Sequence, residues 1–193
     1  MALRDFRLPG GAVPTDKIDL GELALSFGDA TTVDGVVGLG SLSLGGQEYG
    51  ILPAEVPFRL DVSRTSSGHA LRLRFVAAVF GPCFRCLDPA EIEVAVDARE
   101  VDQPDATFDR DDDGPSGEGA EAGSPYVEDG SRLDLAGWAR DALILELPDR
   151  ILCSPDCPGL CPYCGESLVG ADPDEHRHGD EGDPRWAKLR ELG

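Results

Sequence analysis

Alternating apolar and polar residues predict β-structure in the middle of the chain. In the stretch VPFRLDVS, residues 56–63, every second side chain is apolar, which is the period of a half-buried strand. Pro57 favours an edge strand or the start of a strand, because proline lacks a backbone N–H. The stretch HALRLRFVAAVF, residues 69–80, begins with the same alternation. We expect these two strands to pair as a hairpin, with His69 on the surface beside the turn.

A second hairpin is predicted directly after the first. The turn GPCFRCLDP, residues 81–89, contains a C-x-x-C motif, and AEIEVAVDARE, residues 90–100, alternates again. The motif should therefore lie at the tip of this hairpin. Upstream, residues 35–44 read as a glycine-broken strand and residues 18–27 are ambiguous. Together these patterns predict an α+β fold that is mainly antiparallel β, as a sheet or a small barrel.

Helical spacing follows in residues 131–150, SRLDLAGWARDALILELPDR. Ser131 is the expected N-cap, Asp134 stands at the capping-box position, and Pro148 ends the run. The expected core positions of this helix are Leu135, Trp138, Ala139, Ala142 and Leu145. We expect the helix to pack on the sheet. A second, short terminal helix is predicted at residues 183–192, DPRWAKLREL.

Charge is unevenly distributed along the 193 residues, whose formal net charge is -20. The segment 102–130 holds ten acidic residues and one basic residue, with almost no large apolar side chain. Such a segment cannot bury enough surface to offset the entropy of ordering it. We therefore expect one domain, with a β-rich part at 1–101, an acidic disordered loop at 102–130, a helix at 131–150 and a cysteine-rich module with the acidic tail at 151–193.

The large net negative charge of the chain also restricts which partners we expect. Nucleic-acid binders need basic patches that displace counterions from the phosphate backbone, so we do not expect this chain to bind naked nucleic acid. We expect its partners to be basic. The N-terminal residues contain no apolar run typical of a secretory signal, and no stretch reaches the roughly 18 apolar residues of a membrane helix. We expect a cytoplasmic protein without a membrane or small-molecule partner. Its six cysteines should then be reduced, which favours metal binding or redox chemistry over disulfides.

Eight side chains have the spacing of zinc ligands. They are Cys83 and Cys86, then Cys153, Cys157, Cys161 and Cys164, then His176 and His178. Eight donors make two closed tetrahedral sites, which are typical of structural zinc. The preferred pairing joins Cys83, Cys86, Cys153 and Cys157 in one site, and Cys161, Cys164, His176 and His178 in the other. A single site of Cys83, Cys86, Cys161 and Cys164 remains possible, as do solvated histidines.

The string CPYC, residues 161–164, also occurs at the active site of glutaredoxins. In those proteins it follows a strand and opens a helix, which lowers the pKa of one thiol. No βαβ pattern surrounds it here. A thiol redox protein is therefore kept as an alternative, and no catalytic motif for another enzyme class is present.

Three blocks of the sequence resemble the YceD family. They are CFRCL at 83–87, LELPDRILCSPDCPGLCPYCGESL at 145–168 and DPRWAKL at 183–189. Many members have a C-x-C where this chain has His176 and His178, so the capacity to bind metal is retained. The resemblance implies a role in accumulation of large-subunit (23S) rRNA. Combined with the charge, it suggests a non-enzymatic ribosome-biogenesis factor that escorts a basic large-subunit ribosomal protein or binds a pre-ribosomal particle. A zinc-dependent interaction module unconnected to ribosomes is the other alternative.

Overall fold

The computed structural model describes residues 14–104, 123–172 and 176. The chain divides into two compact units. The sheet unit comprises Met1–Phe80 and Ile92–Pro148, and the cysteine unit comprises Gly81–Glu91 and Asp149–Gly193. No helix in the described part of the chain is long and apolar enough to cross a membrane. Residues 183–192, where a terminal helix is predicted, lie outside the described residues.

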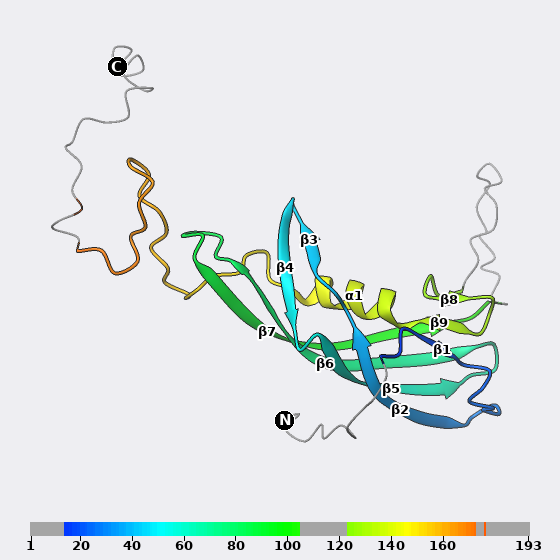
Figure 1. The fold of residues 1–193 in the computed structure, drawn as a ribbon. Helices are drawn as coiled ribbons and strands as arrows, with labels where there is room; N and C mark the ends of the chain where they lie inside the picture. Colours follow the sequence, from blue (N-terminus) through cyan, green and yellow to red (C-terminus); the bar gives the residue numbers. More distant parts are fainter. Residues whose placement is uncertain (1–13, 105–122, 173–175, 177–193) are drawn as a thin grey trace, which may run out of the picture. The chain divides into compact units, whose positions relative to one another are not determined.

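Antiparallel strands make up most of the described fold (Figure 1). The larger sheet has the order β2-β5-β6-β4-β3, and β7 also pairs with β6. Its strands are β2 (Ala30–Gly38), β3 (Leu42–Leu44), β4 (Gln47–Leu52), β5 (Glu55–Arg64), β6 (His69–Pro82) and β7 (Pro89–Asp102). A smaller sheet of order β1-β9-β8 is formed by β1 (Lys17–Asp19), β8 (Val127–Glu128) and β9 (Arg132–Asp134). Among the described strands β2 and β7 each pair with one neighbour, so the larger sheet is open and not a closed barrel.

Both predicted hairpins are confirmed. β5 pairs antiparallel with β6, with Phe58 opposite Phe75 and Arg64 opposite His69. β6 and β7 are joined by the turn that contains the C-x-x-C motif. The alternation along β5 predicted which of its side chains face the core. The apolar ones are completely buried: Val56, Phe58, Leu60 and Val62.

Two glycines of the sheet lie directly opposite phenylalanine rings. Gly35 of β2 faces Phe58 of β5, and Gly50 of β4 faces Phe80 of β6. A Cβ atom on Gly35 would lie 2.9 Å from the buried Phe58 ring, whereas Phe80 is 42% exposed. Each ring covers the backbone of the glycine across from it. Side chains larger than hydrogen are therefore excluded at Gly35 unless the core shifts.

The helix α1 (Leu135–Glu146) contacts β1 and β2 (Figure 1). Its N-cap is Asp134, whose side chain accepts a hydrogen bond from the Gly137 N–H at 3.1 Å. The prediction of Ser131 as the N-cap is wrong, because Arg132–Asp134 form β9 and pair with β1 and β8. Because these residues are extended and paired, α1 begins about one turn later along the chain than predicted.

The buried face of α1 differs from the predicted one at its end. It consists of Leu135, Trp138, Ala139, Ala142 and Leu143. Leu145 is 84% exposed, so its assignment to the core is wrong. Helical spacing identifies the apolar face, but it does not show where the surface that covers this face ends.

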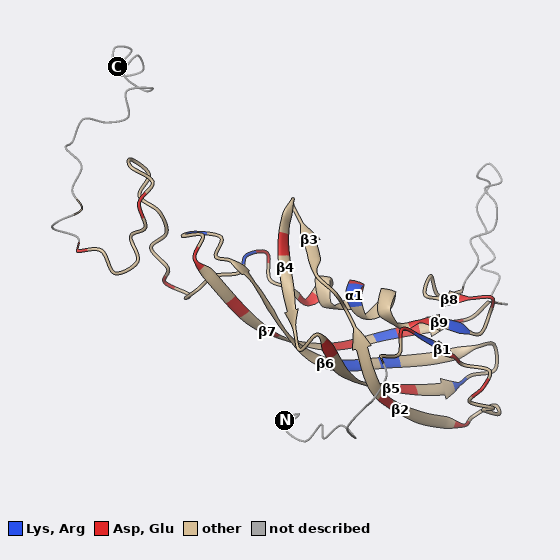
Figure 2. Ribbon diagram, viewed as in Figure 1, with Lys and Arg blue, Asp and Glu red and all other residues tan. Residues whose placement is uncertain are grey.

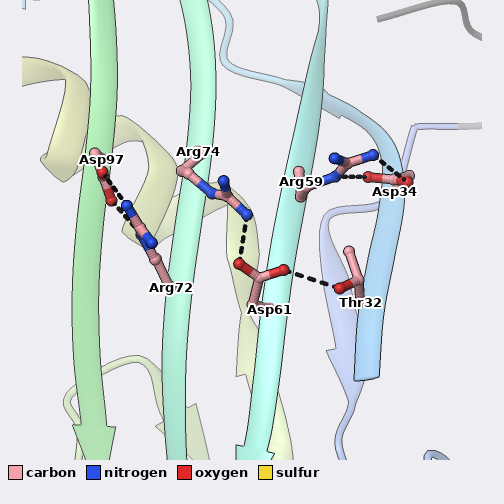
Figure 3. Close-up of polar contacts among 7 residues, drawn as sticks. All are labelled: Thr32, Asp34, Arg59, Asp61, Arg72, Arg74 and Asp97. Carbon is pink, nitrogen blue, oxygen red and sulfur yellow. Dashed lines mark hydrogen bonds and ion pairs between the residues drawn. The ribbon is translucent and has the colours of Figure 1, made fainter. Parts of the chain in front are cut away.

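A row of ion pairs crosses the outer face of the sheet unit (Figure 3). They link Arg59 to Asp34, Arg74 to Asp61 and Arg72 to Asp97, and Asp61 also accepts a hydrogen bond from Thr32. The pairs join β2 to β5, β5 to β6 and β6 to β7. Asp34 lies directly opposite Arg59, whereas Arg74 lies opposite Arg59 and reaches Asp61 diagonally. Each of these arginines thus has an aspartate partner within the sheet.

The acidic segment 102–130 is described only at its two ends. Residues 105–122 lie outside the described residues, and Val127–Glu128 form β8. Asp102 is buried, accepts a hydrogen bond from the Ser124 N–H at 3.2 Å, and lies 3.8 Å from the Nδ1 atom of His69. The Asp102 carboxylate thus joins the start of the segment to Ser124, which follows residues 105–122 along the chain.

Candidate metal centre

Four cysteine sulfurs converge in the cysteine unit. The Sγ atoms of Cys83 and Cys157 are 3.8 Å apart, and those of Cys86 and Cys153 are 3.6 Å apart. All four sulfurs lie within 4.8 Å of one another. Cys83, Cys86 and Cys157 are buried, while Cys153 is exposed. We call these four residues the first cluster.

The spacing of the sulfurs fits a tetrahedral metal ion. With zinc–sulfur bonds of about 2.3 Å, the edges of an ideal tetrahedron of sulfurs are about 3.8 Å long. The two close pairs in the first cluster match this edge, and a disulfide would require about 2.05 Å. Four thiols that surround one point, mostly shielded from water, form a closed donor set typical of structural zinc.

Backbone hydrogen bonds shape the turn that presents Cys83 and Cys86. The Arg85 N–H points at the Cys83 sulfur at 3.4 Å, and the Leu87 N–H donates to the Cys83 carbonyl at 3.0 Å. The Cys83 N–H in turn donates to the carbonyl of Asp88 at 2.7 Å. Leu87 has a φ of 66°, in the left-handed region that glycine normally occupies.

The turn that presents Cys161 and Cys164 repeats this geometry. The Tyr163 N–H points at the Cys161 sulfur at 3.4 Å, and the Gly165 N–H donates to the Cys161 carbonyl at 2.9 Å. The Cys161 N–H donates to the carbonyl of Glu166 at 2.7 Å. Gly165 has a φ of 76° and thus stands where the first turn has Leu87. We call the two turns the first knuckle (residues 83–88) and the second knuckle (residues 161–166).

Contacts within the cysteine unit hold the first knuckle against the segment that supplies Cys153 and Cys157. The Phe84 N–H donates to the Ile151 carbonyl at 2.8 Å, and the Arg85 guanidinium donates to the Cys157 carbonyl at 2.8 Å. Gly159 packs against Arg85 so closely that a Cβ atom would lie 3.2 Å from the Arg85 carbonyl oxygen. The sequence did not reveal this role for Arg85, although it lies between two predicted ligands.

A second cluster contains Cys161, Cys164 and His176. The Cys164 sulfur lies 3.5 Å from Nε2 of His176, whose Nδ1 atom is 3.9 Å from a carboxylate oxygen of Glu166. His178, the predicted fourth donor, lies outside the described residues. The described donors therefore group by the preferred pairing, and the structure does not bring Cys83 and Cys86 together with Cys161 and Cys164 as one site. Two sulfurs and one imidazole form a donor set that suits zinc.

Each knuckle contains one thiol with a lowered pKa. Burial alone would raise the pKa of Cys83, but the backbone N–H groups of Cys86, Cys153 and Arg85 outweigh it and lower the pKa to about 6. Burial likewise opposes ionisation of Cys161, yet the N–H groups of the second knuckle and His176 lower its pKa to about 6. Burial raises the pKa of Cys86. Because the thiolate is the form that binds metal, each knuckle has one donor prepared for coordination.

The CPYC string has a local structure different from the one the redox alternative requires. A glutaredoxin-type motif opens a helix, whereas here Gly165 has a positive φ and Leu160 forms a β-bridge with Ser167. Residues 165–172, the continuous described stretch after the motif, contain no helix. The described hydrogen bonds around Cys161 are those of a knuckle.

His69 is not a surface residue as predicted. It is 6% exposed in the sheet unit, and its Nε2 atom lies 3.2 Å from the guanidinium of Arg64. Burial, followed by the positive charge of Arg64, lowers the pKa of His69. His69 lies on the same alternating face of β6 as the buried Leu71 and Leu73. Its Nδ1 atom lies 3.8 Å from the buried carboxylate of Asp102, a residue predicted to belong to a disordered loop.

Comparison with known proteins identifies a family. The model of "Large ribosomal RNA subunit accumulation protein YceD" matches residues 71–193, which include the first and second clusters. An uncharacterized protein of Mycobacterium tuberculosis is 40% identical over 134 residues, 69% of this chain and 59% of the relative. An uncharacterized protein of Mycobacterium leprae is 48% identical over 67 residues, 35% of this chain and 29% of the relative. The chain thus spans about three fifths of the length of the first of these relatives. No solved structure matches it.

Proposed function

Because the chain belongs to the YceD family, we propose that it is a ribosome-biogenesis factor that promotes accumulation of large-subunit (23S) rRNA. The family match over residues 71–193 is the observation that carries this proposal. A role in ribosome assembly would place the protein in the cytoplasm. The proposal includes no catalytic step, and the protein would act by binding.

The partner that best fits the charge of the chain is a basic large-subunit ribosomal protein, which this protein would escort. The chain has 37 acidic residues against 17 basic ones. Lys and Arg on the strands are interspersed with Asp and Glu (Figure 2), and the three arginines of the outer row are paired with aspartates. Such a surface repels phosphate backbones and attracts lysine- and arginine-rich segments.

Zinc would give the cysteine unit its structure. Cys83, Cys86, Cys153 and Cys157 would hold one ion, and Cys161, Cys164 and His176, with His178 as a proposed fourth ligand, would hold another. Apart from β6 and β7, which enter it at the first knuckle, the described part of this unit has little regular structure. Metal binding would therefore supply much of its folding free energy.

Depletion of the protein in its own cells tests the proposed function. The expected result is a fall in the ratio of 23S to 16S rRNA, restored by the wild-type gene and not by a Cys86→Ser variant. Phe27→Ser serves as the control variant, because Phe27 is 77% exposed in the sheet unit. An unchanged rRNA ratio after complete depletion would contradict the proposal.

The redox alternative makes a different prediction for the same cells. A thiol redox protein would need Cys161 and Cys164 to form a disulfide during its cycle, whereas a structural site keeps both reduced. Trapping of thiols with an alkylating reagent in growing cells measures this difference. A disulfide between these two cysteines in a substantial fraction of the protein would favour the redox function.

A further inference from the structure

The first knuckle exposes two large apolar side chains. Phe84 is 60% exposed and Leu87 is 64% exposed, although both are adjacent to buried cysteines of the first cluster. The Arg150 guanidinium lies over the Phe84 ring, 4.6 Å from its centroid, and so favours one orientation of the ring. Two exposed apolar side chains therefore belong to one short turn. We call Phe84 and Leu87 the knuckle tip.

Leu87 occupies its place at a conformational cost. Its φ of 66° is strained for a residue with a Cβ atom, and the equivalent position of the second knuckle is Gly165. A glycine would thus satisfy the same turn with less strain. Since Leu87 is largely exposed, burial within the cysteine unit does not compensate for this cost. Exposed apolar groups held in a strained conformation are a feature of binding sites.

The described part of the cysteine unit carries an excess of negative charge. The described residues of the cysteine unit include six acidic residues, namely Asp88, Glu91, Asp149, Asp156, Glu166 and Asp172, against Arg85 and Arg150. Within this described part, Asp88, Asp149 and Asp156 make no ion pair. Arg85 is bonded to the Cys157 carbonyl, and Arg150 lies over Phe84. Four thiolates around a divalent ion would add further negative charge.

We propose that the knuckle tip is the docking surface for a cationic protein segment that also carries apolar side chains. Phe84 and Leu87 would bury the apolar side chains, and Asp88, Asp149 and Asp156 would attract lysine and arginine. An exposed aromatic ring could also stack on a nucleotide base, but the net negative charge of the unit opposes a phosphate backbone. This inference rests on the proposed function, since it assigns to the basic partner a defined surface of the chain.

A binding experiment with the zinc-loaded, full-length protein tests the surface directly. The probe is a fluorescent, lysine- and arginine-rich peptide that contains leucines, with a leucine-to-serine version and single-stranded oligouridine for comparison. The leucine-containing peptide should bind most tightly, and its binding should weaken as salt is added. In amide NMR spectra its addition should shift signals of residues 84–88. Tighter binding of oligouridine, or equal binding of both peptides, would overturn the proposal.

Substitutions separate the surface from the fold. Leu87→Gly removes the side chain and at the same time suits the positive φ, so loss of binding cannot be attributed to backbone strain. The double variant Phe84→Ser, Leu87→Gly should bind the peptide about tenfold more weakly, as expected for apolar anchors of an interface. Its zinc content should equal that of the wild type. Phe27→Ser removes a ring of the sheet unit that is more exposed than Phe84, and this variant should bind like the wild type.

Three outcomes in cells relate this inference to the proposed function, and the second and third distinguish the two. If depletion lowers 23S rRNA and the double variant fails to restore it, both are supported. If the double variant restores 23S rRNA fully and binds the peptide like the wild type, the docking surface is wrong and the proposed function stands. If depletion leaves 23S rRNA unchanged, the proposed function fails and the peptide measurements alone decide about the surface.

Discussion

The two knuckles carry different residues at the position of positive φ, Leu87 in the first and Gly165 in the second, which permits a quantitative prediction. A Cβ atom on Gly165 would meet no atom within 4 Å, so Gly165→Ala introduces no steric clash. Its cost is the left-handed conformation, about 1–2 kcal/mol for a residue with a Cβ atom. Alanine also lowers the conformational entropy of the unfolded chain relative to glycine, which stabilises the folded state by about 0.4–1 kcal/mol. The net loss is about 1 kcal/mol, or about a fivefold weaker affinity for metal at the second cluster.

Titration with cobalt as a reporter for zinc measures this change. The visible absorption of bound cobalt distinguishes the four-sulfur site from one with two sulfurs and nitrogen ligands, so the two clusters can be followed separately. Gly165→Ala should weaken the second cluster alone. Leu87→Gly, the matched change in the first knuckle, should leave the first cluster equal or stronger. Weaker metal binding by Leu87→Gly, or an unaffected second cluster in Gly165→Ala, would refute the equivalence of the two turns.

Further predictions concern the sheet unit and are measured by urea unfolding. Gly35→Ala should lower the free energy of unfolding by about 1–3 kcal/mol, because its Cβ atom would press on the fully buried Phe58. Gly50→Ala should cost less, since the ring it meets is partly exposed and can move. Burial lowers the pKa of His69 in the folded state, so the protonated form is favoured by unfolding. Stability should therefore fall as the pH decreases below about 6.5, level off below the folded pKa, and depend less on pH in His69→Gln. Arg72→Gln should leave the urea midpoint almost unchanged, because its ion pair is solvent-exposed.

The β-structure could be predicted from the sequence because its signal is local. Period-two alternation determines which side chains of β5 are buried, and the turn between β6 and β7 is short. The start of α1 could not be predicted in the same way. Ser131 is a good N-cap by residue type, but pairing of Arg132–Asp134 with strands distant in sequence favours an extended backbone there.

Spacing predicts the residue types of the candidate site, and the preferred pairing agrees with the groups in which the described donors lie, but spacing alone did not exclude the single-site alternative. C-x-x-C spacing identifies Cys83 with Cys86, and Cys161 with Cys164, as pairs. Which pair shares a cluster with Cys153 and Cys157 depends on the contacts of Phe84 and Arg85 with the segment after α1, and these link residues more than sixty positions apart. The contact of His69 with Asp102 likewise joins residues distant in sequence.

Native mass spectrometry of the protein isolated gently from its own cells tests most directly whether the cysteine unit is built around metal. The predicted result is a mass with two zinc ions, and Cys86→Ser should lose one of them while the second cluster keeps its ion. A metal-free chain whose mass is lower by the hydrogens of intramolecular disulfides would contradict the structural role of zinc and favour the redox alternative.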